Sequence, residues 1–136
     1  MEWTVEPGAA PGPIRREIRS YLRDRGVDAR LEDAEIVVGE LLANMLRHTL
    51  AGGRVNVDVD HEHGVVRLEV FDFGVHDAFA HKWPALDEHH PPELDRQDGR
   101  GLWIARHVAD DLRVNHQPSG TAVEARFQIG GNPLDV

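Results

Sequence analysis

Three polar residues recur at helical spacing in the segment GELLANMLRH, which runs from Gly39 to His48. Glu40, Asn44 and His48 stand four residues apart, so on a helix they rise about 12 Å along the axis and drift by about 80° around it. They therefore form a polar strip along the border of an apolar stripe. A carboxylate, an amide and an imidazole there would line the rim of a cavity between the helix and a sheet. The alternative is the solvated edge of an amphipathic helix.

A carboxylate ends the alternating segment VVRLEVFD, and a glycine follows it two residues later. Asp72 continues the alternation of Val66, Leu68 and Val70, so we expect its side chain on the face covered by helices. A carboxylate there is costly unless it is paired or hydrogen-bonded, and the exocyclic amine of a purine is a suitable neutral donor. Gly74 would let a flat ring approach the backbone. A turn aspartate with a turn glycine is the alternative.

Glycines precede a helix that we expect from about Arg100 to Asp111. Gly99 and Gly101 would leave backbone N–H groups free at the helix start, and Arg100 adds a formal charge, which indicates an anion or phosphate cradle. The spacing is neither that of a dinucleotide-binding loop nor that of a P-loop. Simple helix-start glycines are the alternative. Thr121 follows a Ser-Gly turn and starts a strand, which is a weaker signal.

Helices and strands must position these residues, and the hydrophobic periodicity predicts both. Each long strand has one apolar and one polar face, which is typical of a mostly antiparallel sheet with helices on a single side. We therefore expect an α+β fold, a two-layer sandwich. The irregular stretch Val75–Asp98 predicts a functional lid or a disordered loop. The helices are expected at Ile14–Arg25, Leu31 to about Thr49 and Arg100–Asp111, and the strands at Trp3–Glu6, Arg54–Asp60, Val65–Asp72, Leu112–Asn115 and Ala122–Ile129.

The composition excludes several classes of protein. The chain has 136 residues, with 15 Lys and Arg against 24 Asp and Glu, and a formal net charge of −9. This length fits a single domain over residues 1–136. The acidic balance disfavours direct nucleic-acid binding, and no apolar run approaches the roughly 20 residues that span a bilayer. The amino terminus lacks the pattern of a secretory signal, so we expect a cytoplasmic protein.

Nine histidines raise a rival interpretation, a metal site. The chain has no cysteine, which excludes disulfides, thiolate nucleophiles and cysteine-based zinc sites. No H-E-x-x-H motif and no pair of histidines four residues apart lies on a predicted helix. Histidines in surface loops are therefore the favoured interpretation. The candidates in predicted loops are His61, His63, His76, His81, His89 and His90.

The order and intervals of the four segments match one family. The helix strip, the strand-end Asp-x-Gly, the Gly-x-Gly helix start and the Gly-Thr strand together resemble the ATPase domain of gyrase-, Hsp90-, histidine-kinase- and MutL-type proteins, which has the Bergerat-type fold. More narrowly, the chain is similar to the small stand-alone anti-sigma factor serine kinases. The resemblance covers nearly the whole chain. It departs from the family at His76, where a second glycine is usual.

The resemblance implies a role for each residue of the helix strip. Asn44 would coordinate a Mg²⁺ ion that bridges the triphosphate oxygens, and a single amide suits Mg²⁺, which keeps several waters. Glu40 would be the catalytic base that deprotonates the acceptor hydroxyl beside the γ-phosphate. His48 would lie near the ribose and phosphate end of the pocket. ATP and Mg²⁺ are thus the implied cofactors.

The resemblance also implies roles for the other three segments. Asp72 would accept a hydrogen bond from the adenine amino group, and Gly74 would lie under the ring. Thr121 would add a hydrogen bond near the adenine, directly or through water. As the lid closes, the phosphates would be wrapped by Gly99, Arg100, Gly101 and Leu102.

By this resemblance the protein is an ATP-binding bacterial regulatory serine/threonine protein kinase of the anti-sigma factor type. Its substrate would be an anti-anti-sigma (STAS-domain) protein, and its second partner an RNA polymerase sigma factor. A homodimer is common in this class, and Ile14–Arg25 with the neighbouring strand would form its interface. The alternative is a non-catalytic ATP-binding module that sequesters a partner. Histidine-kinase chemistry is disfavoured, because no helix with a phosphoacceptor histidine precedes the domain.

Overall fold

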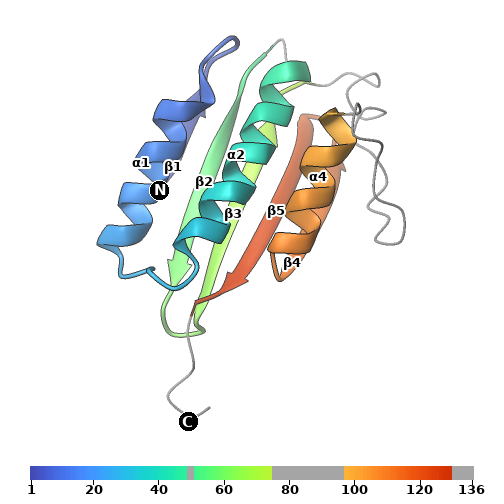
Figure 1. Cartoon of the computed structure of the whole chain (residues 1–136). Coiled ribbons are helices and arrows are strands. Elements are labelled where there is room, and N and C mark those ends of the chain that lie inside the picture. The colour runs from blue at the N-terminus through green and yellow to red at the C-terminus, as the bar shows by residue number, and fades with distance from the viewer. Residues whose placement is uncertain (49–50, 75–96, 130–136) are drawn as a thin grey trace.

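The computed structural model describes residues 1–48, 51–74 and 97–129. In these residues, three helices cover one face of a five-stranded sheet (Figure 1). The helices are α1 (Pro11–Asp24), α2 (Leu31–His48) and α4 (Gln97–Val108), and the strands are β1 (Glu2–Val5), β2 (Gly53–Asp60), β3 (Val65–Asp72), β4 (Asp111–Gln117) and β5 (Gly120–Gln128).

The strands lie in the order β1-β2-β3-β5-β4, and every neighbouring pair is antiparallel. At the centre of the sheet, β3 pairs with β5, although α4 and β4 lie between them in the sequence. This register puts Asp72 opposite Thr121 and Val65 opposite Gln128. The predicted α+β two-layer sandwich, with helices on one face of an antiparallel sheet, is confirmed.

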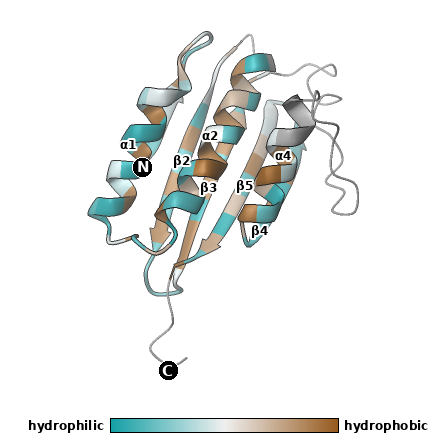
Figure 2. Ribbon diagram, viewed as in Figure 1, coloured by the Kyte–Doolittle hydropathy of each residue, from teal (hydrophilic) through white to brown (hydrophobic). Residues whose placement is uncertain are grey.

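The alternation of apolar residues in the strands accounts for the core. Val55 and Val57 of β2 and Val66, Leu68 and Val70 of β3 are each at most 1% exposed. Figure 2 shows hydrophobic colour on these strands behind α2 and on α2 itself. Successive strand residues point to opposite faces, so the apolar set faces the helices.

Helix α2 is the central element of the helical layer. It packs against α1 on one side and α4 on the other, and it also contacts β3 and β5. Leu41, Leu42 and Met45 are fully buried in these contacts. The rotation of α2 about its axis is therefore fixed by the core, and with it the direction in which Glu40 and Asn44 point.

The elements agree closely with the expected ranges up to β3. β3 agrees to the residue, β2 differs by one residue at its start, and β1, β4 and β5 differ by one or two residues at each end. α1 begins at Pro11, three residues before the expected start at Ile14. Proline suits the first turn of a helix, where its missing N–H has no partner to lose.

The largest difference concerns α4, which spans Gln97–Val108 and not Arg100–Asp111. Gly99 and Gly101 therefore lie inside the first turns of the helix, where we had expected them to precede it. Packing of α4 on α2 overrides the low helix propensity of the glycines. Only the first N–H groups of a helix lack an intrahelical partner, so the helix start favours the N–H of Gly99 over that of Gly101 as a free donor.

The predicted lid falls mostly outside the described residues, since positions 75–96 are not among them. No helix in the described ranges combines the length and the hydropathy that crossing a membrane requires.

Candidate functional site

The predicted site residues lie on four elements that meet at one end of the sandwich. The C-terminal half of α2, the start of α4, the end of β3 and the start of β5 all lie at the upper end of Figure 1. Strand register brings Asp72 opposite Thr121. Helix packing brings Gly101 beside Glu40. Residues far apart in the sequence thus share one end of the fold.

Asp72 supplies a buried carboxylate at the end of β3. Its exposed fraction is 0%, as its place in the strand alternation predicts. The backbone N–H of Gly74 donates a hydrogen bond to Oδ1 over 2.7 Å. A Cβ at position 74 would lie 3.1 Å from the same oxygen, so glycine leaves room for this bond. The role of Asp72 and Gly74 toward a base stays a prediction.

Thr121 lies beside Asp72 on the helix-facing side of the sheet and is 3% exposed. The preceding Gly120 has a φ of +151°, and a Cβ there would come within 1.8 Å of the carbonyl oxygen of Asp72. Only glycine therefore allows β5 to approach β3 this closely. The close approach pairs Thr121 with Asp72, and the two side chains point to the same face of the sheet.

The structure adds a residue that sequence reasoning missed. His116 of β4 lies opposite Thr121, and its Nδ1 is 3.2 Å from the Thr121 hydroxyl oxygen. A two-residue turn, Pro118-Ser119, joins β4 to β5 and sets this pairing. The sequence predicted the turn one residue later, at Ser119-Gly120, which would have paired Pro118 with Thr121, so the sequence did not identify His116.

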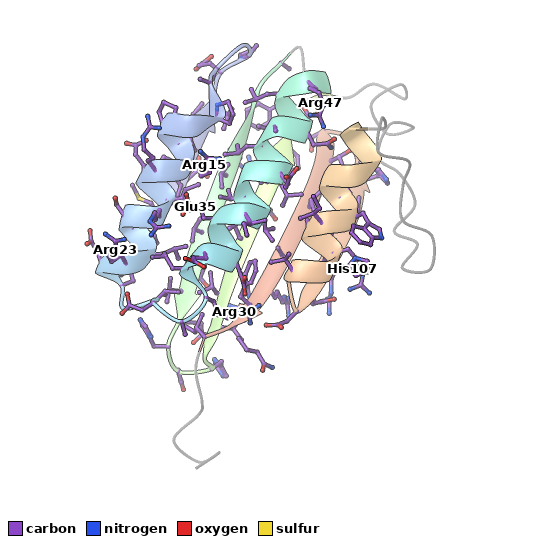
Figure 3. The ribbon with its side chains drawn as sticks, viewed as in Figure 1. Arg15, Arg23, Arg30, Glu35, Arg47 and His107 are labelled. Atoms are coloured by element: carbon purple, nitrogen blue, oxygen red, sulfur yellow. The ribbon has the colours of Figure 1, made fainter. Side chains whose placement is uncertain are left out.

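Asn44 is buried on α2, with an exposed fraction of 1%. Its Nδ2 has no hydrogen-bond partner in the described structure. Its Oδ1 accepts a long hydrogen bond, 3.4 Å, from Nη2 of Arg47, which lies near the C-terminal end of α2 (Figure 3). A buried amide N–H without a partner costs about 1–3 kcal/mol. Such a group is typical of a site that completes its hydrogen bonds with a ligand.

Glu40 is half-buried on α2, and it has the start of α4 and a surface groove as neighbours. Its Oε2 lies 3.2 Å from where a Cβ at Gly101 would stand, so the start of α4 closes over the carboxylate. Glu40 also lines a groove of about 580 Å³ between α1 and α2, together with Arg15, Glu35 and Ile36. The carboxylate is thus next to α4, and the residue also borders the groove.

Four predicted site residues remain: three for which the structure describes the backbone alone, and one that belongs to the hydrophobic core. His48, Gly99 and Arg100 lie in α2 and α4, and the structure describes only their backbone. Leu102 is 1% exposed, and its side chain belongs to the hydrophobic core. Leu102 therefore positions α4, and any contact with phosphate would come from its backbone.

The donor set at Asn44 fits Mg²⁺. This ion prefers oxygen ligands and is usually held by one or two protein groups plus waters and phosphate oxygens. The amide oxygen of Asn44 has one lone pair engaged, by the long bond from Arg47, and a second lone pair to offer. Asn44 is therefore the residue that would hold the ion.

The rival histidine site gains no support in the described ranges. There, no three His, Asp or Glu side chains are grouped so that they could hold a metal ion. His61 hydrogen-bonds to the carbonyl oxygen of Arg25 at 2.7 Å. His63 lies 2.8 Å from Asp60, and its hydrogen bonds hold the pKa of that carboxyl below its ordinary value. His76, His81, His89 and His90 lie outside the described residues.

Comparison with known protein families agrees with this geometry. The histidine kinase-like ATPase domain family matches residues 4–127. The chain belongs to this family. The sandwich described above is thus a Bergerat-type ATPase fold, and membership implies that this domain binds ATP. No curated protein matches the sequence.

Three of the solved structures that resemble this chain are bacterial. The RsbU and RsbW domains of Rv1364c from Mycobacterium tuberculosis match with a TM-score of 0.68 and 20% identity, over 95% of this chain and 32% of that chain. The SiaB–SiaC complex from Pseudomonas aeruginosa matches with a TM-score of 0.62 and 14% identity, over 93% and 88%. The mycobacterial sensor histidine kinase MprB matches with a TM-score of 0.50 and 21% identity, over 93% and 95%. The chain spans about a third of the first of these structures. At these identities the likeness concerns the fold.

Proposed function

We propose that the protein is an ATP- and Mg²⁺-dependent serine/threonine protein kinase of the anti-sigma factor type. In this proposal it phosphorylates a serine of an anti-anti-sigma (STAS-domain) partner and also sequesters an RNA polymerase sigma factor. Two of the similar structures support a partner-switching role, since one contains an RsbW domain and another is a complex of SiaB with SiaC.

One observation carries the catalytic part of the proposal. The carboxylate of Glu40 lies beside the start of α4, and Glu40 is also one of the residues that line the groove between α1 and α2. A general base must lie within hydrogen-bond reach of the hydroxyl whose proton it takes, and that hydroxyl must stand beside the transferred phosphate. In this proposal, the start of α4 beside Glu40 binds the phosphate, and the neighbouring groove receives the protein partner.

The residues divide the chemistry between them. Asp72 would accept a hydrogen bond from the adenine amino group, and Asn44 would hold Mg²⁺, which would supply charge neutralisation for the triphosphate. Glu40 takes the proton of the serine hydroxyl as that oxygen bonds to the γ-phosphorus. The bond from the γ-phosphorus to the bridging oxygen breaks, and ADP leaves. Phosphoryl transfer depends mainly on positioning and charge neutralisation, so these few groups suffice.

The groove beside Glu40 suits a protein substrate. Arg15 and Arg19 of α1 form ion pairs with Glu35 of α2 across its floor, and Figure 3 shows Arg15 and Glu35 between the two helices. Ile36 is 46% exposed on the same side of α2. We propose that this exposed apolar side chain and the ion pairs beside it contact the protein partner.

The test uses purified protein, radiolabelled ATP with Mg²⁺, and each STAS-domain protein of the source genome in turn. We expect transfer to one of them, and Glu40→Gln should reduce the rate by about 10²–10⁴-fold while ATP affinity survives. Asp72→Asn should weaken ATP binding at least about tenfold in calorimetry, because it removes a charged acceptor. Glu32→Gln is the matched control, since Glu32 lines the same groove two turns earlier on α2.

The outcomes separate this proposal from its alternative. Loss of transfer in Glu40→Gln with retained ATP binding supports a kinase. ATP binding without transfer to any STAS-domain protein, together with partner binding that ignores Glu40→Gln, would instead support a non-catalytic module. Undiminished ATP binding in Asp72→Asn would place the nucleotide elsewhere.

A further inference from the structure

His116 stands next to the base-binding end of the site without belonging to any of the four predicted segments. It is the register partner of Thr121, which is in turn the register partner of Asp72. Residues paired across antiparallel strands point to the same face. Imidazole, hydroxyl and carboxylate therefore form a row across three strands on the helix-facing side of the sheet.

The row has a defined polarity because a threonine hydroxyl carries a single proton. An ionised carboxylate only accepts hydrogen bonds, so the proton of Thr121 is best directed toward the Asp72 side of the row. The hydroxyl oxygen then needs a donor on its other side. Nδ1 of His116, 3.2 Å away, provides that donor when it carries the proton.

We infer that His116 is a positioning residue that fixes the direction of the Thr121 hydroxyl and thereby the recognition of the purine. The inference rests on the proposed binding of ATP at Asp72. The ring nitrogen N1 of adenine is an acceptor that adjoins the carbon bearing the amino group. With Asp72 taking the amino group, the Thr121 hydroxyl donates to N1, directly or through one water. His116 touches neither atom and acts through Thr121.

The test measures binding of ATP and of 1-deaza-ATP, which lacks the N1 acceptor, by calorimetry with Mg²⁺. His116→Phe keeps a flat ring but removes Nδ1, and Thr121→Val removes the hydroxyl. His116→Asn places an amide N–H where Nδ1 stood. His63→Phe is the matched control, because His63 is also a hairpin histidine with its own partner, Asp60.

We expect His116→Phe and Thr121→Val each to weaken ATP binding about three- to tenfold, the effect of one hydrogen bond. The double variant should lose no more than either single variant. His116→Asn should stay within about twofold of the parent, as should His63→Phe. None of the variants should change the affinity for 1-deaza-ATP, which is already weakened in the parent.

Two results would overturn the role of His116. One is a His116→Phe variant that binds ATP as the parent does. The other is an equal loss for ATP and 1-deaza-ATP, since that would reflect a general distortion of the hairpin. A parent protein that binds no ATP would overturn the proposed function as well. The readout is binding alone, so absence of phosphoryl transfer leaves this test unaffected.

Discussion

Gly101→Ala should separate the stability of the fold from its activity. Gly101 lies inside α4, where replacing glycine by alanine stabilises a helix by about 0.5–1 kcal/mol. For a domain of this size, that gain corresponds to a rise in Tm of about 2–4 °C. The new Cβ would lie 3.2 Å from Oε2 of Glu40 and 3.7 Å from its carbonyl oxygen. The carboxylate must therefore give way by a few tenths of an ångström.

The displacement should cost activity, because a misplacement of 1 Å at a reacting group can cost about 10²-fold. For a few tenths of an ångström we expect a loss of about three- to tenfold in phosphoryl transfer, with ATP affinity nearly unchanged. Thermal unfolding by circular dichroism measures the first effect, and transfer from radiolabelled ATP measures the second.

Gly39→Ala is the matched control for this experiment. Gly39 lies in α2 next to Glu40 in sequence, and its Cβ would instead meet the flexible side chain of Arg15 at 3.3 Å. Gly39→Ala should show the same gain in thermal stability as Gly101→Ala without the loss of phosphoryl transfer. The reasoning is refuted if Gly101→Ala transfers phosphate as well as Gly39→Ala does, or if it unfolds at a lower temperature than the parent.

Two further variants probe the frame around the site. Gly120→Ala should destabilise the fold by about 2 kcal/mol or more in urea unfolding and abolish ATP binding, because its Cβ would meet the carbonyl oxygen of Asp72 at 1.8 Å; wild-type stability would contradict this. Burial alone would raise the pKa of Asp110, but hydrogen bonds from the Gln128 N–H and from Arg30 lower it overall. Its contribution to stability should therefore be present above about pH 4 and be lost as the pH falls through the lowered pKa. At pH 7, Asp110→Asn should be less stable than the parent by about 1 kcal/mol or less, because the ion pair between Asp110 and Arg30 is partly exposed. Urea unfolding at several pH values should show that this difference in stability shrinks near pH 3. A difference that stays constant with pH would contradict the assignment.

The parts of the fold that the sequence predicted best are those in which one local rule decides. β3 is the clearest case, because period-two alternation from Val66 to Val70 admits only one face for the core. The burial of Asp72 follows from the same alternation. Helix α2 was equally clear, since its apolar stripe must face the sheet.

The parts that sequence reasoning missed depend on contacts between distant segments. The start of α4 was placed too late because glycine signals a helix boundary locally, whereas here Gly101 packs against Glu40 of another helix. The depth of Asn44 likewise depends on its neighbours on other elements, which periodicity within α2 does not report. His116 needed the register of the last hairpin, which is set by the turn at Pro118.

The site also explains why α2 carries polar groups in its buried half. Leu41, Leu42 and Met45 fix the helix in the core, so Asn44 is held in place whether or not a ligand is present. Its unpartnered Nδ2 then lowers the stability of the free protein, and an apolar residue of similar size would remove that cost. Such a cost persists where function needs it. In the proposed site, an arrangement fixed by the core means that a nucleotide would find Asn44 already in place, so little binding energy would be spent on ordering that side chain. The fixed placement of Asn44 that lowers the stability of the free protein would therefore favour tight binding of a nucleotide at the proposed site.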